Sequence, residues 1–286
     1  MNIFMYGDIG GHLLPFRESL VRDVGLDHET LALPEDAIVI QVGDLVHRGP
    51  DSDTLVPWVD EVMSANPGRW IQLLGNHEAM HLGGPTFGQQ INGQMVEFAI
   101  NDDSEKTLTR WYASGQAKLA VAVERTSGEF AGRHMLVSHA GLARQTWAAI
   151  GEPLTAAGAA ATLNRQDAKY GFAPGWLLGG YAQGSDNSLM PPSVVWASAA
   201  KEVYPSWENR DSLFDQVHGH SGIYSWSNQS WYVDASIRAR TEIWKTKRFS
   251  RWENFDGGYF FCIDQALGAE APYFDVVPFK VEGEIL

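Results

Sequence analysis

The sequence predicts a single α/β domain whose sheet carries a polar site along one edge. Three short apolar runs read as buried strands, at residues 2–6, 37–42 and 70–74, and each ends in a glycine followed by a polar residue. Two segments with apolar residues at helical spacing lie between them, at 16–24 and 55–63. This alternation of strands and helices is typical of βαβ units with parallel strands.

The three strand ends carry similar polar motifs. They are Gly7-Asp8, Gly43-Asp44 and Gly75-Asn76-His77-Glu78. Their spacing of roughly 30–40 residues matches one βαβ crossover for each interval. Because the carboxyl ends of neighbouring parallel strands meet at one edge of a sheet, we expect these motifs to form one site.

The remainder of the chain predicts more elements and no clear linker. Helices are expected at 95–114 and 155–168, and strands at 118–124, 134–138, 230–233, 259–263 and 274–279. The glycine- and proline-rich segment 171–192 is either disordered or a functional loop, and its aromatic residues favour a loop that packs. We therefore expect one domain over residues 1–286, with insertions near 83–116 and 150–195.

The composition is that of a globular protein without a membrane segment. The chain has 286 residues, of which 44% are hydrophobic and 20% charged, and this length is enough to bury a core. No apolar run is long enough to cross a bilayer. The apolar opening at 1–6 is too short for a signal peptide and has no basic start, so we expect a cytoplasmic protein.

Charge and cysteine content exclude several kinds of site. The formal net charge is −14, from 21 basic and 35 acidic residues, and no lysine or arginine cluster suggests a nucleic-acid surface. The single cysteine, Cys262, excludes an internal disulfide and a cysteine metal cage, and its apolar surroundings predict a buried thiol. A phosphorylated substrate would need metal ions to supply the attraction that this acidic chain lacks.

The residues at the strand ends form a plausible set of metal ligands. They are Asp8, Asp44, Asn76, His77, His139 and His220. Carboxylate, amide and imidazole groups together suit manganese, iron or zinc. Two aspartates from adjacent strands would let Asp44 bridge two ions, and such a pair can activate a hydroxide for attack on phosphorus. His77 could then protonate the leaving oxygen, and Arg48 could bind the phosphate oxygens.

These motifs together resemble a known family. They are Gly7-Asp8, Gly43-Asp44-Leu45-Val46-His47-Arg48-Gly49, Gly75-Asn76-His77-Glu78, His139-Ala140-Gly141 and Gly219-His220-Ser221. In this order they resemble the calcineurin-like metallophosphoesterases, and most closely the phosphoprotein phosphatase branch. Within that branch they are similar to bacterial serine/threonine phosphatases and symmetrical diadenosine tetraphosphatase.

The resemblance implies a fold, a cofactor and roles for residues. The fold would be a four-layer αββα sandwich, with two packed β-sheets and helices outside. The cofactor would be two divalent ions, most often manganese or mixed iron and zinc. Asp8 would bind the first ion, Asp44 would bridge, and the second would be held by Asn76, His139 and His220. His77 would be the general acid, and Arg48 with Asn76 would bind the phosphate group.

The chain departs from the family pattern at three positions. Gly10 stands where the family has a histidine ligand of the first ion, and either His12 or water would replace it. His47 stands where protein phosphatases have an aspartate, which favours a nucleotide or another small substrate. Ser198 stands where several bacterial relatives have a second phosphate-binding arginine. The possible substitutes for that arginine are Arg144, Arg165 and Arg210.

Two functional hypotheses follow from these observations. The first is a metal-dependent phosphoesterase that acts on phosphoproteins or on nucleotides such as dinucleoside polyphosphates. The second is a degenerate phosphatase fold that binds a metal or ligand without turnover, and it is motivated by Gly10 and Ser198.

Overall fold

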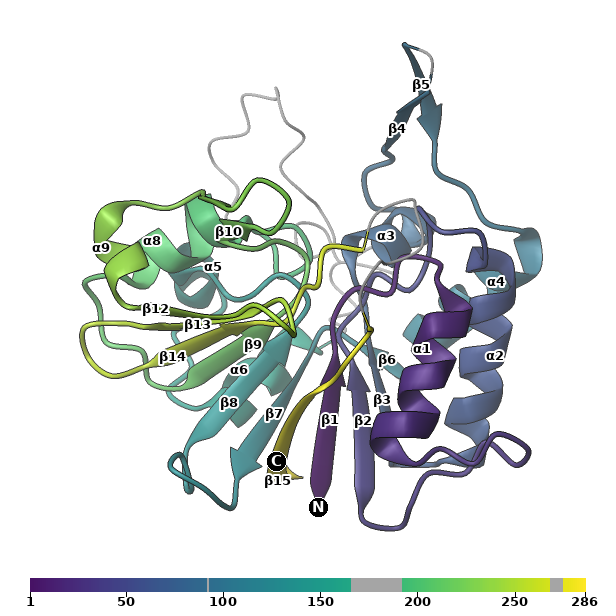
Figure 1. The fold of residues 1–286 in the computed structure, drawn as a ribbon, viewed down its shortest axis with the longest axis horizontal. Helices are drawn as coiled ribbons and strands as arrows, with labels where there is room; N and C mark the ends of the chain where they lie inside the picture. Colours follow the sequence, from purple (N-terminus) through teal and green to yellow (C-terminus); the bar gives the residue numbers. More distant parts are fainter. Residues whose placement is uncertain (92, 166–191, 268–274) are drawn as a thin grey trace.

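A continuous mixed β-sheet runs through the molecule (Figure 1). The computed structural model describes residues 1–91, 93–165, 192–267 and 275–286. Within these residues eleven strands pair in the order β12-β13-β14-β9-β8-β7-β15-β1-β2-β3-β6. The strands are β1 (Asn2–Tyr6), β2 (Ala37–Gln41), β3 (Trp70–Leu73), β6 (Ala117–Lys118), β7 (Ala120–Arg125), β8 (His134–Ser138), β9 (Asp215–His218), β12 (Thr241–Trp244), β13 (Phe249–Glu253), β14 (Tyr259–Cys262) and β15 (Phe279–Ile285).

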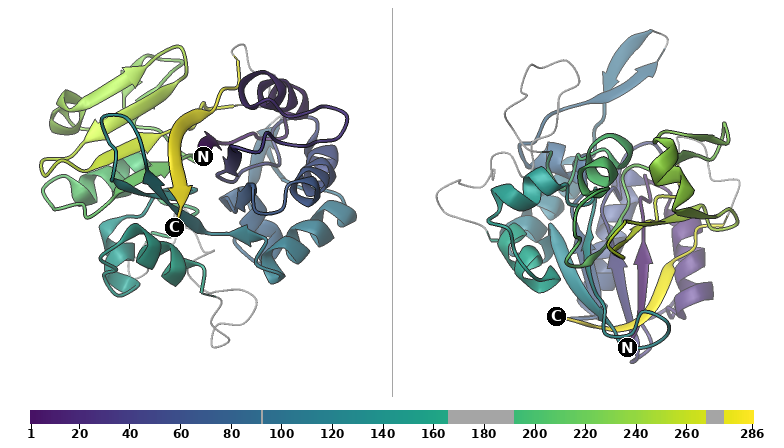
Figure 2. Two further views of the ribbon diagram at one scale, coloured as in Figure 1. Left: turned by 90° about the horizontal axis from the view of Figure 1, so that it is seen from below. Right: turned by 90° about the vertical axis from the view of Figure 1, so that its left-hand side faces the viewer.

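The strand β15 joins two halves of this sheet that pack against each other. It pairs antiparallel with β1 on one side and with β7 on the other, and it crosses between the halves in Figure 2. Side chains from both halves share one buried apolar cluster, which includes Ile3, Ile40, Val137, Phe261 and Phe279. The expected sandwich is therefore confirmed, with the two sheets continuous through β15 rather than separate.

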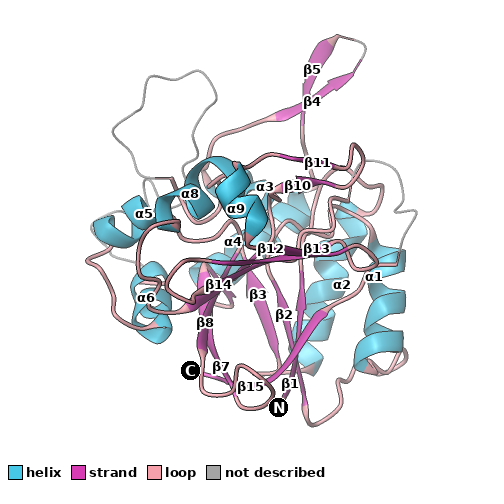
Figure 3. Cartoon of the chain, turned by 60° about the vertical axis from the view of Figure 1, so that its left-hand side comes forward, coloured by secondary structure: helices cyan, strands magenta, loops and turns pink. Residues whose placement is uncertain are grey.

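Helices cover both outer faces of the sandwich (Figure 3). The first half carries α1 (Leu13–Ser19) with the π-helical turn Leu20–Val24, α2 (Ser52–Ala65) and α4 (Asp102–Ala113), whereas α6 (Ala156–Leu163) packs on β7 and β8 of the second half. The second half also carries α5 (Arg144–Ala149), the π-helical turn Ala199–Val203, α8 (Tyr204–Trp207) and α9 (Ala235–Ala239). Phe16 of α1 is fully buried and packs edge-on against Tyr6 of β1, at 5.1 Å between ring centroids. The layers are thus helix, sheet, sheet and helix.

The helix expected at 95–114 is wrong in its first part. Residues 94–97 form the strand β5 (Gln94–Glu97), which pairs with β4 (Gly88–Ile91) in a hairpin that projects from the molecule in Figure 1. The helix α4 begins only at Asp102, because Asn101 caps it by accepting a 2.8 Å hydrogen bond from the Ser104 N–H. The Asn-Gly pair at 92–93 is a hairpin signal that outweighs the helical spacing.

Other element boundaries differ less from expectation. The strand expected at 274–279 is wrong over 275–278, and residue 274 lies outside the described residues. The strand β15 begins at Phe279, directly after Pro278, which has no N–H to pair. The strand expected at 118–124 is divided at Leu119 into β6 and β7. The segment 171–192 lies outside the described residues apart from Pro192. Cys262 is buried as expected. No helix within the described residues is both long and apolar enough to cross a membrane.

A buried ion pair ties β9 to the neighbouring segments, and it yields a stability prediction. Asp215 is fully buried, and its carboxylate accepts hydrogen bonds from Arg133 Nε at 2.8 Å and from the Tyr259 N–H at 2.9 Å. We expect Asp215→Ala to lower the free energy of unfolding by about 2–4 kcal/mol, because both donors lose a buried partner. Urea denaturation measures this loss.

A surface ion pair provides the matched control. Asp103 pairs with Lys106 at 3.3 Å, and both side chains are exposed. We expect Asp103→Ala to change the free energy of unfolding by less than about 0.5 kcal/mol. Equal losses in the two variants would show that the buried pair has no special role.

Candidate active site

Six strands of the sheet bring polar residues to one edge of the sandwich. The strands β1, β2 and β3 pair in parallel in one half, and β8, β9 and β14 pair in parallel in the other. The polar residues that follow them are Asp8, Asp44, Asn76, His139, His220 and Asp264. A cavity of about 100 Å³ lies at this edge, and its walls include Asp8, Asp44, Arg48, His77, His220 and Asp264.

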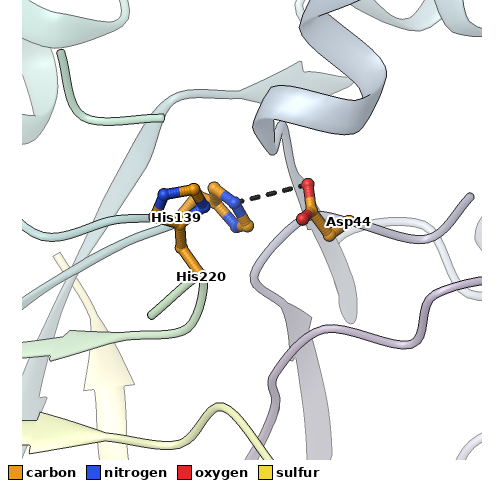
Figure 4. Close-up of side chains that lie close together, drawn as sticks. All are labelled: Asp44, His139 and His220. Carbon is orange, nitrogen blue, oxygen red and sulfur yellow. Dashed lines mark ion pairs between the residues drawn. The ribbon is translucent and has the colours of Figure 1, made fainter. Parts of the chain in front are cut away.

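Asp44, His139 and His220 form the centre of this site (Figure 4). One ligand atom of each lies within 4.8 Å of the others. His139 Nε2 lies 3.3 Å from Asp44 Oδ1 and 3.1 Å from Asn76 Oδ1, and His220 Nδ1 lies 2.9 Å from Asn76 Oδ1. The structure therefore brings together the ligands expected for the second ion.

The orientation of His139 fits a bound cation. Its Nδ1 lies 2.9 Å from the Val42 carbonyl oxygen, and a hydrogen bond there requires the proton on Nδ1. The Nε2 lone pair then faces the oxygens of Asp44 and Asn76, which are also electron-rich. A divalent ion between these atoms would satisfy all three, and the donor set suits manganese, iron or zinc.

Burial shifts the pKa values of these groups in opposite directions. It raises the pKa of Asp44 to about 7, and it raises the pKa of Asp8 well above its usual range with help from the nearby charges of Asp264 and Asp44. Burial lowers the pKa of His139 to about 4 and that of His220 well below 6.5. The imidazoles are thus neutral, as metal ligation requires, and a cation would stabilise the ionised carboxylates.

Glu78 holds the loop that follows β2. This buried carboxylate accepts hydrogen bonds from the N–H groups of Gly75, Asp44 and Leu45 at 2.7–2.8 Å. The loop needs such support because Asp44, His47 and Arg48 all have positive φ angles, between 54° and 73°. Strained backbone of this kind is common at functional sites, where the surrounding structure stabilises it.

Removal of the Glu78 charge should destabilise this loop. Glu78→Gln would direct an amide N–H₂ group toward N–H groups that now have an acceptor. We expect the free energy of unfolding at pH 8 to fall by about 2–3 kcal/mol. The exposed Glu61→Gln on α2 is the matched control and should leave it unchanged within about 0.5 kcal/mol. Chemical denaturation measures the free energy of unfolding of both variants. Equal values for Glu78→Gln and Glu61→Gln would contradict the supporting role of Glu78.

His77 is buried at the cavity wall and held from two sides. Its backbone N–H donates to Asp44 Oδ1 at 3.0 Å, and its Nδ1 lies 2.8 Å from Nδ1 of His47. His47 Nε2 in turn lies 3.0 Å from Nε2 of His81, and Phe98 stacks on the His47 ring at 4.8 Å. His47 thus contacts the ring of His77 from the side away from the cavity, and His81 contacts His47 in turn. The sequence did not reveal this row of three histidines.

The four arginines considered for phosphate binding lie in three different places on the molecule. Arg48 lines the cavity, and its Nη2 lies 3.5 Å from His77 Nε2. Arg144 and Arg210 instead line a different surface groove, and Arg165 lines a third. Ser198 caps the π-helical turn after it, where its hydroxyl accepts a hydrogen bond from the Lys201 N–H. Of these four arginines, Arg48 is therefore the one that lines the cavity.

The structure does not place His12 in the cavity. His12 is buried just before α1 and is not among the residues that line the cavity, so its role as a ligand stays a prediction.

Asp264 lines the cavity together with Gly10, and the sequence analysis did not single it out. The signal for Asp264 was present, because it follows the apolar run 259–263 as Asp8 and Asp44 follow theirs.

Comparisons with solved structures give low similarities. A cold-active protein tyrosine phosphatase is 14% identical, with 93% of this chain and 70% of that chain covered and a TM-score of 0.46. The corresponding phosphatase of a psychrophilic Shewanella species is 16% identical, with 89% and 76% covered and a TM-score of 0.44. A metallophosphoesterase from Sphaerobacter thermophilus is 18% identical, with 49% and 47% covered and a TM-score of 0.26. Likenesses this weak carry no argument about activity.

A family comparison is decisive where the structural comparisons are not. The curated proteins compared with the chain include no match. The model of the calcineurin-like phosphoesterases, in contrast, matches residues 1–245, which include every motif described above. The chain therefore belongs to the calcineurin-like phosphoesterase family of metal-dependent hydrolases.

Proposed function

We propose that the chain hydrolyses phosphate ester or anhydride bonds at a centre of two divalent ions, most simply manganese. The observation that carries this proposal is the convergence of carboxylate, amide and imidazole groups at one edge of the sheet, next to the cavity that Arg48 and His77 line. Asp8 and Asp44 would bind the first ion. The second would be bound by Asp44, Asn76, His139 and His220.

The side chains around the ions would carry the remaining steps. When bound, the ions supply charge stabilisation and an activated water. The guanidinium of Arg48 and the amide of Asn76 would bind and orient the phosphate oxygens. His77 Nε2, which faces Asp44 and Arg48, would donate a proton to the leaving oxygen.

The protonation of His77 depends on the substrate. Burial and the charge of Arg48 lower the pKa of His77 well below 6.5 in the free protein. A bound phosphate dianion would raise that pKa, because a nearby negative charge favours the imidazolium. His47 Nδ1 lies 2.8 Å from His77 Nδ1, and this contact would keep His77 Nε2 directed toward the phosphate. Bound substrate would thus favour the protonated form of the general acid.

The size and rim of the cavity support a small-molecule or nucleotide substrate. About 100 Å³ is below the roughly 300–1,000 Å³ of pockets that enclose whole ligands, so the cavity would hold a phosphate group. Half-buried aromatic rings surround His77: Phe87 lies 4.8 Å and Phe98 5.2 Å from it, and Trp196 packs on Phe87. Such rings could stack on a nucleobase outside the cavity.

A substrate panel tests this proposal. Manganese-loaded protein would be assayed with p-nitrophenyl phosphate, phosphoserine and phosphotyrosine peptides, and diadenosine tetraphosphate. We expect hydrolysis of p-nitrophenyl phosphate and a higher kcat/KM for the nucleotide than for either peptide. A higher kcat/KM for a peptide would overturn the substrate class. Two bound ions without hydrolysis of any compound would identify a metal-binding protein without turnover.

A further inference from the structure

Asp264 occupies the same topological position as the expected metal ligands. It follows β14, which pairs in parallel with β9 so that Cys262 lies opposite His218. The Ile263 N–H donates to the His218 carbonyl at 2.8 Å, which continues this pairing beyond the strand. Asp264 therefore leaves the sheet at the same level as His220, which follows β9.

Asp264 also lies directly beside Asp8. A Cβ atom added to Gly7 would lie 2.4 Å from the Ile263 carbonyl oxygen and 3.3 Å from the Asp264 Cα, so the ends of β1 and β14 are in backbone contact. Asp8 is held in place because its Oδ1 accepts a 2.9 Å hydrogen bond from the His220 N–H. Both carboxylates line the cavity of about 100 Å³.

The charges around this cavity favour a bound cation. Asp8, Asp44 and Asp264 all line it, and Asp44 and Asp264 are 3% and 9% exposed as whole residues. One oxygen of Asp264 accepts a hydrogen bond from the Ala266 N–H at 2.7 Å. Arg48 is the cation among the lining residues, but it is exposed. Three such carboxylates in one small space need a bound cation to stay ionised together.

Gly10 leaves space in the cavity because it has no side chain. It lines the same cavity, and a Cβ atom added there would have no atom of another segment nearer than 3.7 Å. His12 is not among the lining residues.

We propose that Asp264 is a ligand of the first metal ion and takes the coordination position that Gly10 cannot fill. The proposal rests on the dinuclear centre of the proposed function. The first site would then have three carboxylates, from Asp8, Asp44 and Asp264, whereas the second contains two imidazoles. Oxygen-rich sites favour hard ions, so the first site should select manganese or magnesium over zinc more strongly than the second.

Metal stoichiometry tests this assignment without relying on activity. Wild-type protein and Asp264→Asn would be dialysed to equilibrium against micromolar manganese chloride, and bound metal would be counted by elemental analysis. We expect two ions per wild-type chain and one per variant chain. The control is Asp275→Asn, at a position that also lies between β14 and β15. The Asp275 side chain is 82% exposed, and this variant should bind two ions. His12→Gln should also bind two.

The outcomes separate this inference from the proposed function. If wild-type protein binds two ions and Asp264→Asn binds them with the same affinity, the inference is overturned and the function stands. Loss of an ion from His12→Gln but not from Asp264→Asn would assign the position to His12. If wild-type protein binds no ion, the proposed function itself fails.

A crystal structure of the manganese-loaded wild-type protein decides the matter if Asp264→Asn does not fold. An anomalous peak at a coordination distance of about 2.0–2.6 Å from an Asp264 oxygen would support the assignment. A first-site peak without Asp264 in contact would overturn it.

Discussion

Asp44→Asn is expected to lower kcat/KM for p-nitrophenyl phosphate by about a thousandfold or more. Asp44 would bridge the two ions, and its Oδ1 also accepts the His77 N–H at 3.0 Å. An amide would be a poor bridging ligand, and the loss of several kcal/mol of transition-state stabilisation corresponds to about this factor. Steady-state kinetics with saturating manganese measures the change.

The stability of the same variant separates lost chemistry from lost structure. Burial raises the pKa of Asp44 to about 7, so metal-free protein at pH 8 contains a buried, ionised carboxylate at an energetic cost. Asn removes this charge, and the metal-free variant should unfold at no lower urea concentration than metal-free wild type. Asp103→Asn, on the exposed face of α4, should retain full activity. A metal-loaded Asp44→Asn with more than a tenth of wild-type kcat/KM would contradict the bridging role.

His77→Gln should lower kcat by an amount that depends on the leaving group. General acid catalysis is worth about 10²–10⁴ in rate, and it matters most when the leaving oxygen is strongly basic. We therefore expect a loss of at least about a hundredfold for phenyl phosphate and a much smaller loss for p-nitrophenyl phosphate, whose nitrophenolate leaves without a proton. Parallel kinetics on the two esters measures this difference.

The control for His77 is a histidine far from the cavity. His134 begins β8 and lies 3.7 Å from Glu124, and its side chain is 40% exposed. His134→Gln should leave kcat for both esters unchanged. Equal losses for the two esters in His77→Gln would show that His77 binds or positions the substrate rather than donating a proton.

Much of the site could be predicted from the sequence because its positions depend on local patterns. Asp8, Asp44 and Asn76 each follow a buried apolar strand after a glycine, and parallel pairing brings such strand ends to one edge. These strand-end positions require no knowledge of which distant segments meet. The four layers, in contrast, were expected only from the family resemblance, because the alternation of strands and helices predicts βαβ units and no second sheet.

Other parts depend on long-range packing, which a local pattern indicates weakly or not at all. Asp264 reaches the site because β14 pairs with β9, although 44 positions separate Asp264 from His220, and no glycine marks its strand end. The contact of His47 with His81 requires the loop after β2 to lie against α3 (Asn76–Ala79) and the turn that follows it. The helix expected over Met95 and Phe98 failed because apolar residues along one arm of a hairpin can share helical spacing.

Titration of metal-stripped protein with manganese, followed by p-nitrophenyl phosphate hydrolysis, tests the two-ion mechanism most directly. The stripped protein should be inactive, and activity should rise until two ions are bound per chain. Hydrolysis by the stripped protein, or full activity with a single bound ion, would contradict the mechanism.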